Sequence, residues 1–141
     1  MLGTLTDEEI DRLLHEETVG RIGVSDDVKT YVVPVSYVYD GTSIYVHSYD
    51  GEKLRMLRAN PAVCFEIDRV EHLSSWRSVI AWGRYEELMG DLATGAMNLL
   101  AWRLREEVPS ETAGPQGPHG REPGTAFRIR ITEKTGRFEQ P

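Results

Sequence analysis

The sequence has only one cysteine, Cys64, and no run of eighteen apolar residues. A single cysteine cannot form an internal disulfide, nor a CxxC pair that binds a metal or exchanges electrons. Because Val63 and Phe65 flank it, we interpret Cys64 as a small buried hydrophobe. Without a long apolar run, and without a basic region leading into an apolar stretch near the N-terminus, we expect a cytoplasmic protein with no membrane-spanning helix.

Basic residues are also in the minority. Sixteen Lys and Arg stand against twenty-three Asp and Glu, which gives a formal net charge of -7. Nucleic acids and anionic membranes both bind to a broad cationic surface. We therefore expect neither as a partner, and any phosphate site must be local.

Common cofactor and catalytic motifs are missing as well. With no GxGxxG and no GxxxxGK[ST], a nucleotide would not be held by a Rossmann or P-loop device. The four histidines, at 15, 47, 72 and 119, have no common spacing and no HExxH arrangement, so no protein metal site is predicted. No GxSxG elbow occurs, although a Ser/His/Asp triad assembled from distant residues stays open.

Alternating apolar and polar residues, rich in β-branched and aromatic types, predict β-strands in most of the chain. Asp26-Asp27 separates two of them, and Asp40-Gly41 is a typical hairpin turn between two more. The predicted strands number six and cover residues 18–25, 30–39, 42–48, 62–68, 78–88 and 125–132.

Three segments are predicted to be helical. Thr6-Asp7-Glu8-Glu9 matches the S/T-x-x-E capping box and begins a helix that reaches about residue 17. A short helix follows Asp50-Gly51 and is stopped by Asn60-Pro61. A third helix covers residues 91–107, with Asp91 as its cap.

The remaining segments are polar. Residues 108–124 are rich in Pro, Gly, Ser and Glu and predict a mobile loop, and residues 133–141 a polar tail. Six strands of this length in 141 residues should curl into an antiparallel barrel or near-barrel. We expect a mainly β (α+β) fold with flanking helices, in a single domain spanning residues 1–141.

The stretch 44–60, where a strand turns into the short helix, is the most informative. Lys53 falls in the first helical turn, where the positive end of the helix dipole favours an acidic residue. Backbone N–H groups, the Ser48 hydroxyl, the His47 imidazole and the Lys53 ammonium would together suit a phosphate. The alternative is a solvated corner with a surface lysine.

Two further features admit both a functional and a structural explanation. Pro34 cannot donate to a sheet ladder, so its strand belongs at an edge or a bulge, where a ligand can approach the backbone or where nothing binds. Trp76 and Arg77 lie in a predicted loop, residues 69–77. A tryptophan beside an arginine is frequent at interfaces and ligand sites, yet a loop tryptophan more often covers the core.

In this order the segments resemble a known family, the FMN-binding split-barrel proteins related to pyridoxamine 5'-phosphate oxidase, and most closely the branch of the nitroimidazole-resistance proteins. Six fragments carry the resemblance: GRIGV at 20–24, YVVPVSYVYDG at 31–41, IYVHS at 44–48, GEK at 51–53, LRANPAVCFEID at 57–68 and SVIAWGR at 78–84. The oxidases have an arginine at the position of Tyr31-Val32 in this chain. They have a second arginine directly before the lysine that meets the phosphate, where this chain has Glu52. The vitamin oxidase activity of that family, which acts on pyridoxamine 5'-phosphate, is therefore not expected.

The resemblance implies a six-stranded antiparallel split β-barrel that holds FMN between the two subunits of a homodimer. The implied lining of the isoalloxazine ring is Val33, Pro34, Val35 and Ser36. His47, Ser48 and Lys53 would face the flavin edge and phosphate, and Trp76, Arg77 and Ser78 would add further cofactor contacts.

The function implied is that of an FMN-dependent oxidoreductase, similar to nitroreductases, which passes electrons from a reduced donor to a small electron-poor acceptor such as a nitro compound or quinone. His47 is the best candidate for a catalytic acid or base. The alternative is a non-catalytic module that binds flavin or haem. The colour of the preparation separates these readings: yellow supports flavin and red supports haem.

Overall fold

The computed structural model describes residues 1–49, 51–105 and 124–141. These ranges contain eight strands and three helices. In chain order they are β1 (Leu2–Thr4), α1 (Asp7–Glu16), β2 (Val19–Ser25), β3 (Thr30–Ser36), β4 (Val38–Tyr39), β5 (Ser43–Ser48), α2 (Glu52–Ala59), β6 (Ala62–His72), β7 (Ser75–Glu87), α3 (Gly90–Arg103) and β8 (Thr125–Glu139).

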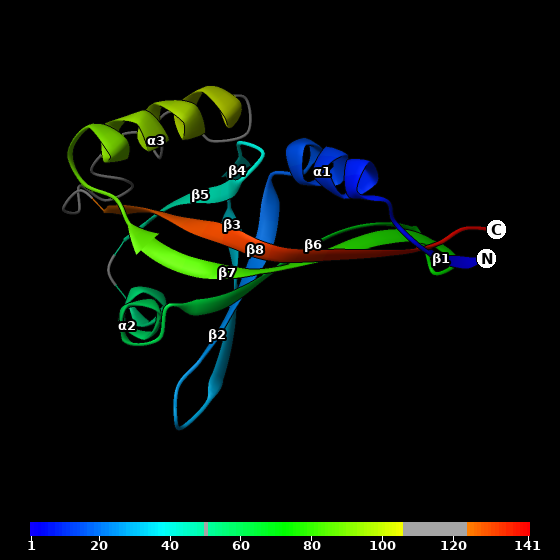
Figure 1. Ribbon diagram of the computed structural model, residues 1–141, viewed down its shortest axis with the longest axis horizontal. Helices are drawn as coiled ribbons and strands as arrows, with labels where there is room; N and C mark the ends of the chain where they lie inside the picture. Colours follow the sequence, from blue (N-terminus) through cyan, green and yellow to red (C-terminus); the bar gives the residue numbers. More distant parts are fainter. Residues whose placement is uncertain (50, 106–123) are drawn as a thin grey trace.

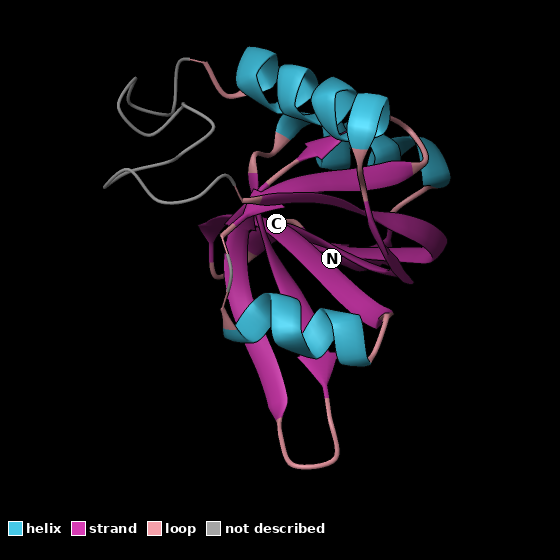
Figure 2. Cartoon of the chain, turned by 90° about the vertical axis from the view of Figure 1, so that its left-hand side faces the viewer, coloured by secondary structure: helices cyan, strands magenta, loops and turns pink. Residues whose placement is uncertain are grey.

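All the strands belong to one antiparallel sheet that curls but does not close. Its order is β3-β2-β6-β7-β8-β5-β4, and β1 pairs with the far end of β8. The long strands β6, β7 and β8 form a curved band, with α1 and α3 on one side and α2 on the other (Figure 1). The hairpin of β2 and β3 projects from the bottom of both views (Figures 1 and 2). The predicted mainly β split-barrel fold is confirmed.

The core fills the concave side of this sheet. Every second residue is buried in β2, in most of β5, in the first part of β6 as far as Ile67 and in β7 from Val79 to Tyr85, as expected for strands with one face on a core. The predicted capping box is present, with Thr6 and Glu9 each accepting a backbone N–H of the other, and it starts α1, which buries Ile10, Leu13 and Leu14. α2 buries Leu54, Met56 and Leu57, so both helices seal the barrel with apolar side chains.

Two predicted strands have different bounds in the structure: one was predicted too long and the other too short. The predicted strand 30–39 divides into β3 and β4 at Tyr37, whose N–H bonds Thr18 and whose hydroxyl donates to the Leu14 carbonyl at 2.7 Å. These contacts bury Tyr37 completely and turn the chain. The predicted polar tail was wrong over residues 133–139, which continue β8. The tertiary structure supplies the reason, since β7 pairs with residues 133–139 along one side and β1 pairs with residues 137–139 on the other.

The predicted loop 69–77 was also wrong. β6 and β7 continue as a hairpin down to Leu73 and Ser74, and Trp76 is a strand residue opposite Val70 and Glu139. The composition of residues 69–77 does not indicate a strand. The strand forms because β6 and β7 pair with each other and β7 also pairs with β8. Cys64, interpreted as buried, is only half-buried, on the outer face of β6.

The third helix differs at its start. Met89, not Asp91, is its N-cap, and no side chain caps it; Asp91 lies in the first turn instead. Gly90 adopts a φ of 59°, a conformation that suits glycine at this sharp turn out of β7. The predicted mobile loop 108–124 lies, except for Gly124, outside the described residues. Among the described helices, none is long and apolar enough to cross a membrane.

Candidate functional site

The corner between β5 and α2 places Lys53 in the first turn of a short helix, as the sequence predicts. β5 ends at Ser48, Gly51 is the N-cap of α2, and Lys53 is the second residue of the helix. Gly51 has no side chain to accept a hydrogen bond from the first turn, and no side chain among the described residues caps the helix. Within residues 1–49 and 51–105, the first N–H groups of α2 therefore have no side-chain partner and suit water or a ligand.

Lys53 is half-buried at this corner, and burial lowers the pKa of its ammonium. Within the described part of the chain it makes no hydrogen bond and no ion pair. The neighbouring carboxylate, Glu52, instead pairs with Lys29 at 3.5 Å and with Arg55. A partly desolvated ammonium beside open helix N–H groups is a site for an anion.

His47 and Ser48 point to opposite faces of β5, because successive strand residues alternate. Ser48 is buried and its hydroxyl donates to the Tyr49 carbonyl at 3.1 Å. His47 is half-buried against the Tyr49 ring, with the ring centroids 5.1 Å apart. Burial lowers the pKa of His47, so its imidazole is neutral at neutral pH.

His47 lines a cavity of about 250 Å³ between the sheet and α3. The other lining residues are mostly apolar: Glu87, Leu88, Met89, Ala93, Met97, Gly124, Thr125 and Ala126. Gly124 lies close against the imidazole, since a Cβ there would be 2.8 Å from His47 Nε2. No motif in the sequence indicates that Met89 and Met97 would line a cavity with His47, because only the fold decides where α3 and its N-cap lie.

The four residues predicted to line a flavin ring divide between the two sides of β3. Val33 and Val35 face the core, whereas Pro34 and Ser36 are exposed on the outer side. β3 pairs with β2 alone and ends the sheet, so the prediction of an edge strand for Pro34 is confirmed.

Trp76, Arg77 and Ser78 lie at the opposite end of the molecule from Lys53. Trp76 donates its indole N–H to Glu139 at 3.0 Å. Ser78 is opposite Arg137 in β8, while Ser48 is opposite Thr125, twelve residues away along the same strand. Since a strand rises about 3.3 Å per residue, roughly 40 Å of strand separates them. One chain does not bring these two groups together.

Comparison with known proteins agrees with this fold. The family model for pyridoxamine 5'-phosphate oxidase matches residues 6–138. The chain belongs to the pyridoxamine 5'-phosphate oxidase family. A relative in Rhizobium meliloti (strain 1021), an uncharacterized protein, is 30% identical over 136 residues, which cover 92% of this chain and 90% of the relative.

Solved structures of similar proteins have a fold like that of this chain. A FAD-binding protein from Mesorhizobium loti is 32% identical with a TM-score of 0.77, over 99% of both chains. A protein from Bacteroides thetaiotaomicron VPI-5482 designated for 5-nitroimidazole antibiotic resistance has a TM-score of 0.74 at 20% identity, over 98% of this chain and 89% of its own. The second likeness concerns the fold alone.

Proposed function

We propose that this protein binds FMN and uses it to pass electrons from a reduced donor to a small electron-poor acceptor, such as a nitro compound or a quinone. The observation that carries the proposal is Lys53, a half-buried ammonium without a described partner at the open N-terminus of α2. Membership of the family and the FAD-binding relative at 32% identity support a flavin.

The corner fits one terminal phosphate. Lys53 would supply a charge-assisted hydrogen bond and the first turn of α2 its N–H groups. The open backbone edge of β3 at Pro34 would accommodate a flat ring system. When bound, the flavin supplies the redox chemistry, and the protein supplies placement and exclusion of water. The described corner offers one lysine and one helix N-terminus, which suit a single terminal phosphate. We therefore favour FMN over FAD.

A second copy of the chain completes the proposed site. The corner at Lys53 and the contacts predicted at Trp76 and Ser78 are roughly 40 Å apart along one strand. They can serve the same flavin only if they come from different subunits. We therefore propose a homodimer in which each flavin lies between the corner of one protomer and the start of β7 of the other.

His47 is the candidate for holding or moving a proton. Its neutral imidazole has one N–H to donate and one nitrogen to accept, next to the cavity of about 250 Å³. Pockets for drug-sized ligands usually measure about 300–1,000 Å³, so this one suits a molecule of a single ring. The proposed acceptors have that size.

The test is a titration of the purified apo-protein with FMN, FAD, riboflavin and haemin, followed by absorbance and flavin fluorescence. FMN should bind more tightly than riboflavin by roughly tenfold or more, because riboflavin lacks the phosphate. Tighter binding of FAD would correct the choice of flavin. Uptake of haemin alone would favour the haem-binding alternative, and uptake of none would overturn the proposal.

Turnover needs a second measurement. The flavin-loaded protein is reduced chemically without oxygen and mixed with 2-nitrofuran or with benzoquinone. Reoxidation faster than that of free reduced FMN at the same concentration supports an oxidoreductase. Reoxidation no faster than that of free flavin indicates a binding module without turnover.

A further inference from the structure

The cavity beside His47 contains one carboxylate, that of Glu87, the last residue of β7. Burial lowers the pKa of His47, so its imidazole is neutral at neutral pH. Among the described side chains that line the cavity, Glu87 is therefore the one that carries a charge. Thr125 is the remaining polar side chain, and the thioethers of Met89 and Met97 belong to an otherwise apolar lining.

Two donors hold the Glu87 carboxylate in place through one of its oxygens. The Tyr85 hydroxyl donates to Oε1 at 2.6 Å, and Arg58 Nε donates to the same oxygen at 2.8 Å. These bonds, the one from Tyr85 first, lower the pKa of Glu87, so the carboxyl is ionised at neutral pH. The second oxygen, Oε2, makes no hydrogen bond or ion pair within residues 1–49, 51–105 and 124–141. A carboxylate oxygen of this kind can accept from a ligand.

Two groups in the same cavity can donate a hydrogen bond. The neutral imidazole of His47 has one N–H. Thr125 Oγ1 accepts from Arg58 Nη2 at 3.4 Å, and among the described contacts the hydrogen of this hydroxyl is not used. Together with Oε2 of Glu87, the cavity offers an acceptor and two donors around an apolar interior.

We infer that this cavity selects an uncharged, flat, single-ring carboxamide, and that Glu87 is the residue that determines the selection. The inference rests on the proposed function, because it names the class of small acceptor that the cavity beside His47 takes. The amide N–H₂ group donates to Glu87 Oε2, and the amide oxygen accepts from His47 or Thr125. The ring lies against the two thioethers, since sulfur makes favourable contacts with aromatic rings. Nitrobenzamides are electron-poor members of this class.

A carboxylic acid of the same shape is the informative comparison. Benzoate matches benzamide in size, but it has no donor for Glu87 and brings a second negative charge. Solvent moderates the repulsion between the two carboxylates, because the side chain of Glu87 is 33% exposed. Benzoate should therefore bind more weakly than benzamide by roughly fivefold or more.

The test is an NMR titration of the full chain with benzamide and with benzoate, in the presence of FMN and with the methionine methyl groups labelled. The chain has four methionines, so the shifted signals report where the probe binds. Benzamide should shift Met89 and Met97, which line the cavity. Met56, completely buried in the core, and Met1, at the exposed N-terminus, should not shift.

Two variants test the role of the carboxylate. Glu87→Gln removes the charge and keeps the size, so benzamide and benzoate should bind within about twofold of each other. Glu86→Gln is the matched control, because Glu86 pairs with Arg128 and Arg130 and is not among the described residues that line the cavity. It should keep the preference of the wild type. Melting curves check that both variants are folded.

The outcomes for the cavity and for the flavin are separate. Equal affinities of the wild type for the two probes, or no shift of Met89 and Met97, overturn the inference. FMN uptake measured in the same sample then leaves the proposed function intact. A protein that prefers benzamide but takes up no flavin keeps the ligand class and overturns the proposed function.

Discussion

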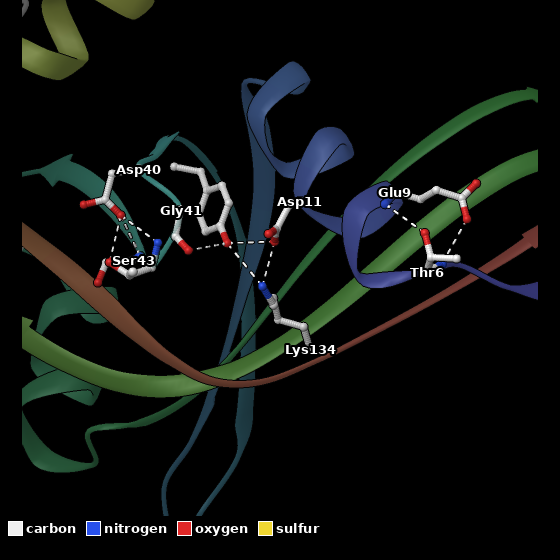
Figure 3. A network of polar contacts seen from close by, with 9 residues as sticks. Thr6, Glu9, Asp11, Asp40, Gly41, Ser43 and Lys134 are labelled. Carbon is white, nitrogen blue, oxygen red and sulfur yellow. Dashed lines mark hydrogen bonds and ion pairs between the residues drawn. The ribbon is translucent and has the colours of Figure 1, made fainter.

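Lys134 of β8 donates a hydrogen bond of 2.6 Å to Asp11 of α1, across 123 residues of sequence. The Tyr39 hydroxyl lies 2.9 Å from the same carboxylate oxygen and 2.9 Å from the Gly41 carbonyl, so β4 joins the contact (Figure 3). Tyr39 is almost completely buried and Lys134 half-buried. The network ties the first helix to the last strand and to the turn before β5.

The first prediction concerns this network. Lys134→Met removes the ammonium and keeps the apolar stem, and should lower the free energy of unfolding by about 1 kcal/mol, a value discounted because Asp11 is 41% exposed. Urea denaturation measures it. Lys29→Met is the matched control: its side chain is 54% exposed and its pair with Glu52 is 3.5 Å long, so it should change stability little. Equal losses in both variants would contradict the prediction.

The effect of Lys134→Met should depend on pH. Burial by itself would raise the pKa of Asp11, but the hydrogen bonds from Lys134 and Tyr39 outweigh it and lower that pKa below its ordinary value of 3.8. A carboxyl with a depressed pKa contributes stability above its unfolded pKa and loses it as the pH falls through the folded one. The difference between wild type and variant should therefore shrink below about pH 4.

Lys53→Ala tests the phosphate corner. It removes one charge-assisted hydrogen bond, and should weaken FMN binding by about 1.5–3 kcal/mol, or roughly tenfold to a hundredfold. Riboflavin affinity should hardly change, because the lysine would meet only the phosphate. Flavin titration and a melting curve of the apo-variant measure both effects. Equal losses for FMN and riboflavin would place the lysine elsewhere than at the phosphate.

Gly83→Ala should be strongly destabilising. A Cβ at this position would lie 2.3 Å from the Arg130 carbonyl oxygen, at the irregularity where β7 and β8 change register. Backbone must move to admit it, at a cost of about 1–3 kcal/mol. Gly95→Ala in α3 meets open space and should stabilise by about 0.5–1 kcal/mol. Chemical denaturation of the two variants compares them, and a neutral Gly83→Ala would mean that the strands separate more easily than the structure indicates.

Glu86 should contribute stability only above acidic pH. Hydrogen bonds from Arg130 and Arg128 lower the pKa of Glu86 to about 2. Its stabilising contribution is present above the ordinary pKa of 4.5 and is lost as the pH falls toward 2. Because the site is 35% exposed, Glu86→Gln should cost no more than about 1 kcal/mol at neutral pH. Urea denaturation at several pH values measures the free energy of unfolding of wild type and variant. The difference between the two should vanish as the pH approaches about 2.

Local chemistry in the sequence determined several parts of this protein. The capping box at Thr6 and Glu9 starts α1, and the alternation of apolar residues gives β2, β5 and the first part of β8, because these signals act between residues near each other in the chain. Lys53 in the first turn of a short helix was also apparent, and the structure adds that it is half-buried.

The tertiary structure decided what depends on distant partners. Residues 133–139 and the hairpin of β6 and β7 are strands because neighbouring strands satisfy their backbone groups, which their own side chains do not indicate. Register likewise placed Ser48, at the start of the corner that holds Lys53, and Ser78 opposite residues twelve apart in β8, and it placed Glu66 and Asp68 beside Arg21 of β2. Sequence spacing fixes which side of a strand a residue occupies, but only the pairing of strands decides which residues it meets across the sheet.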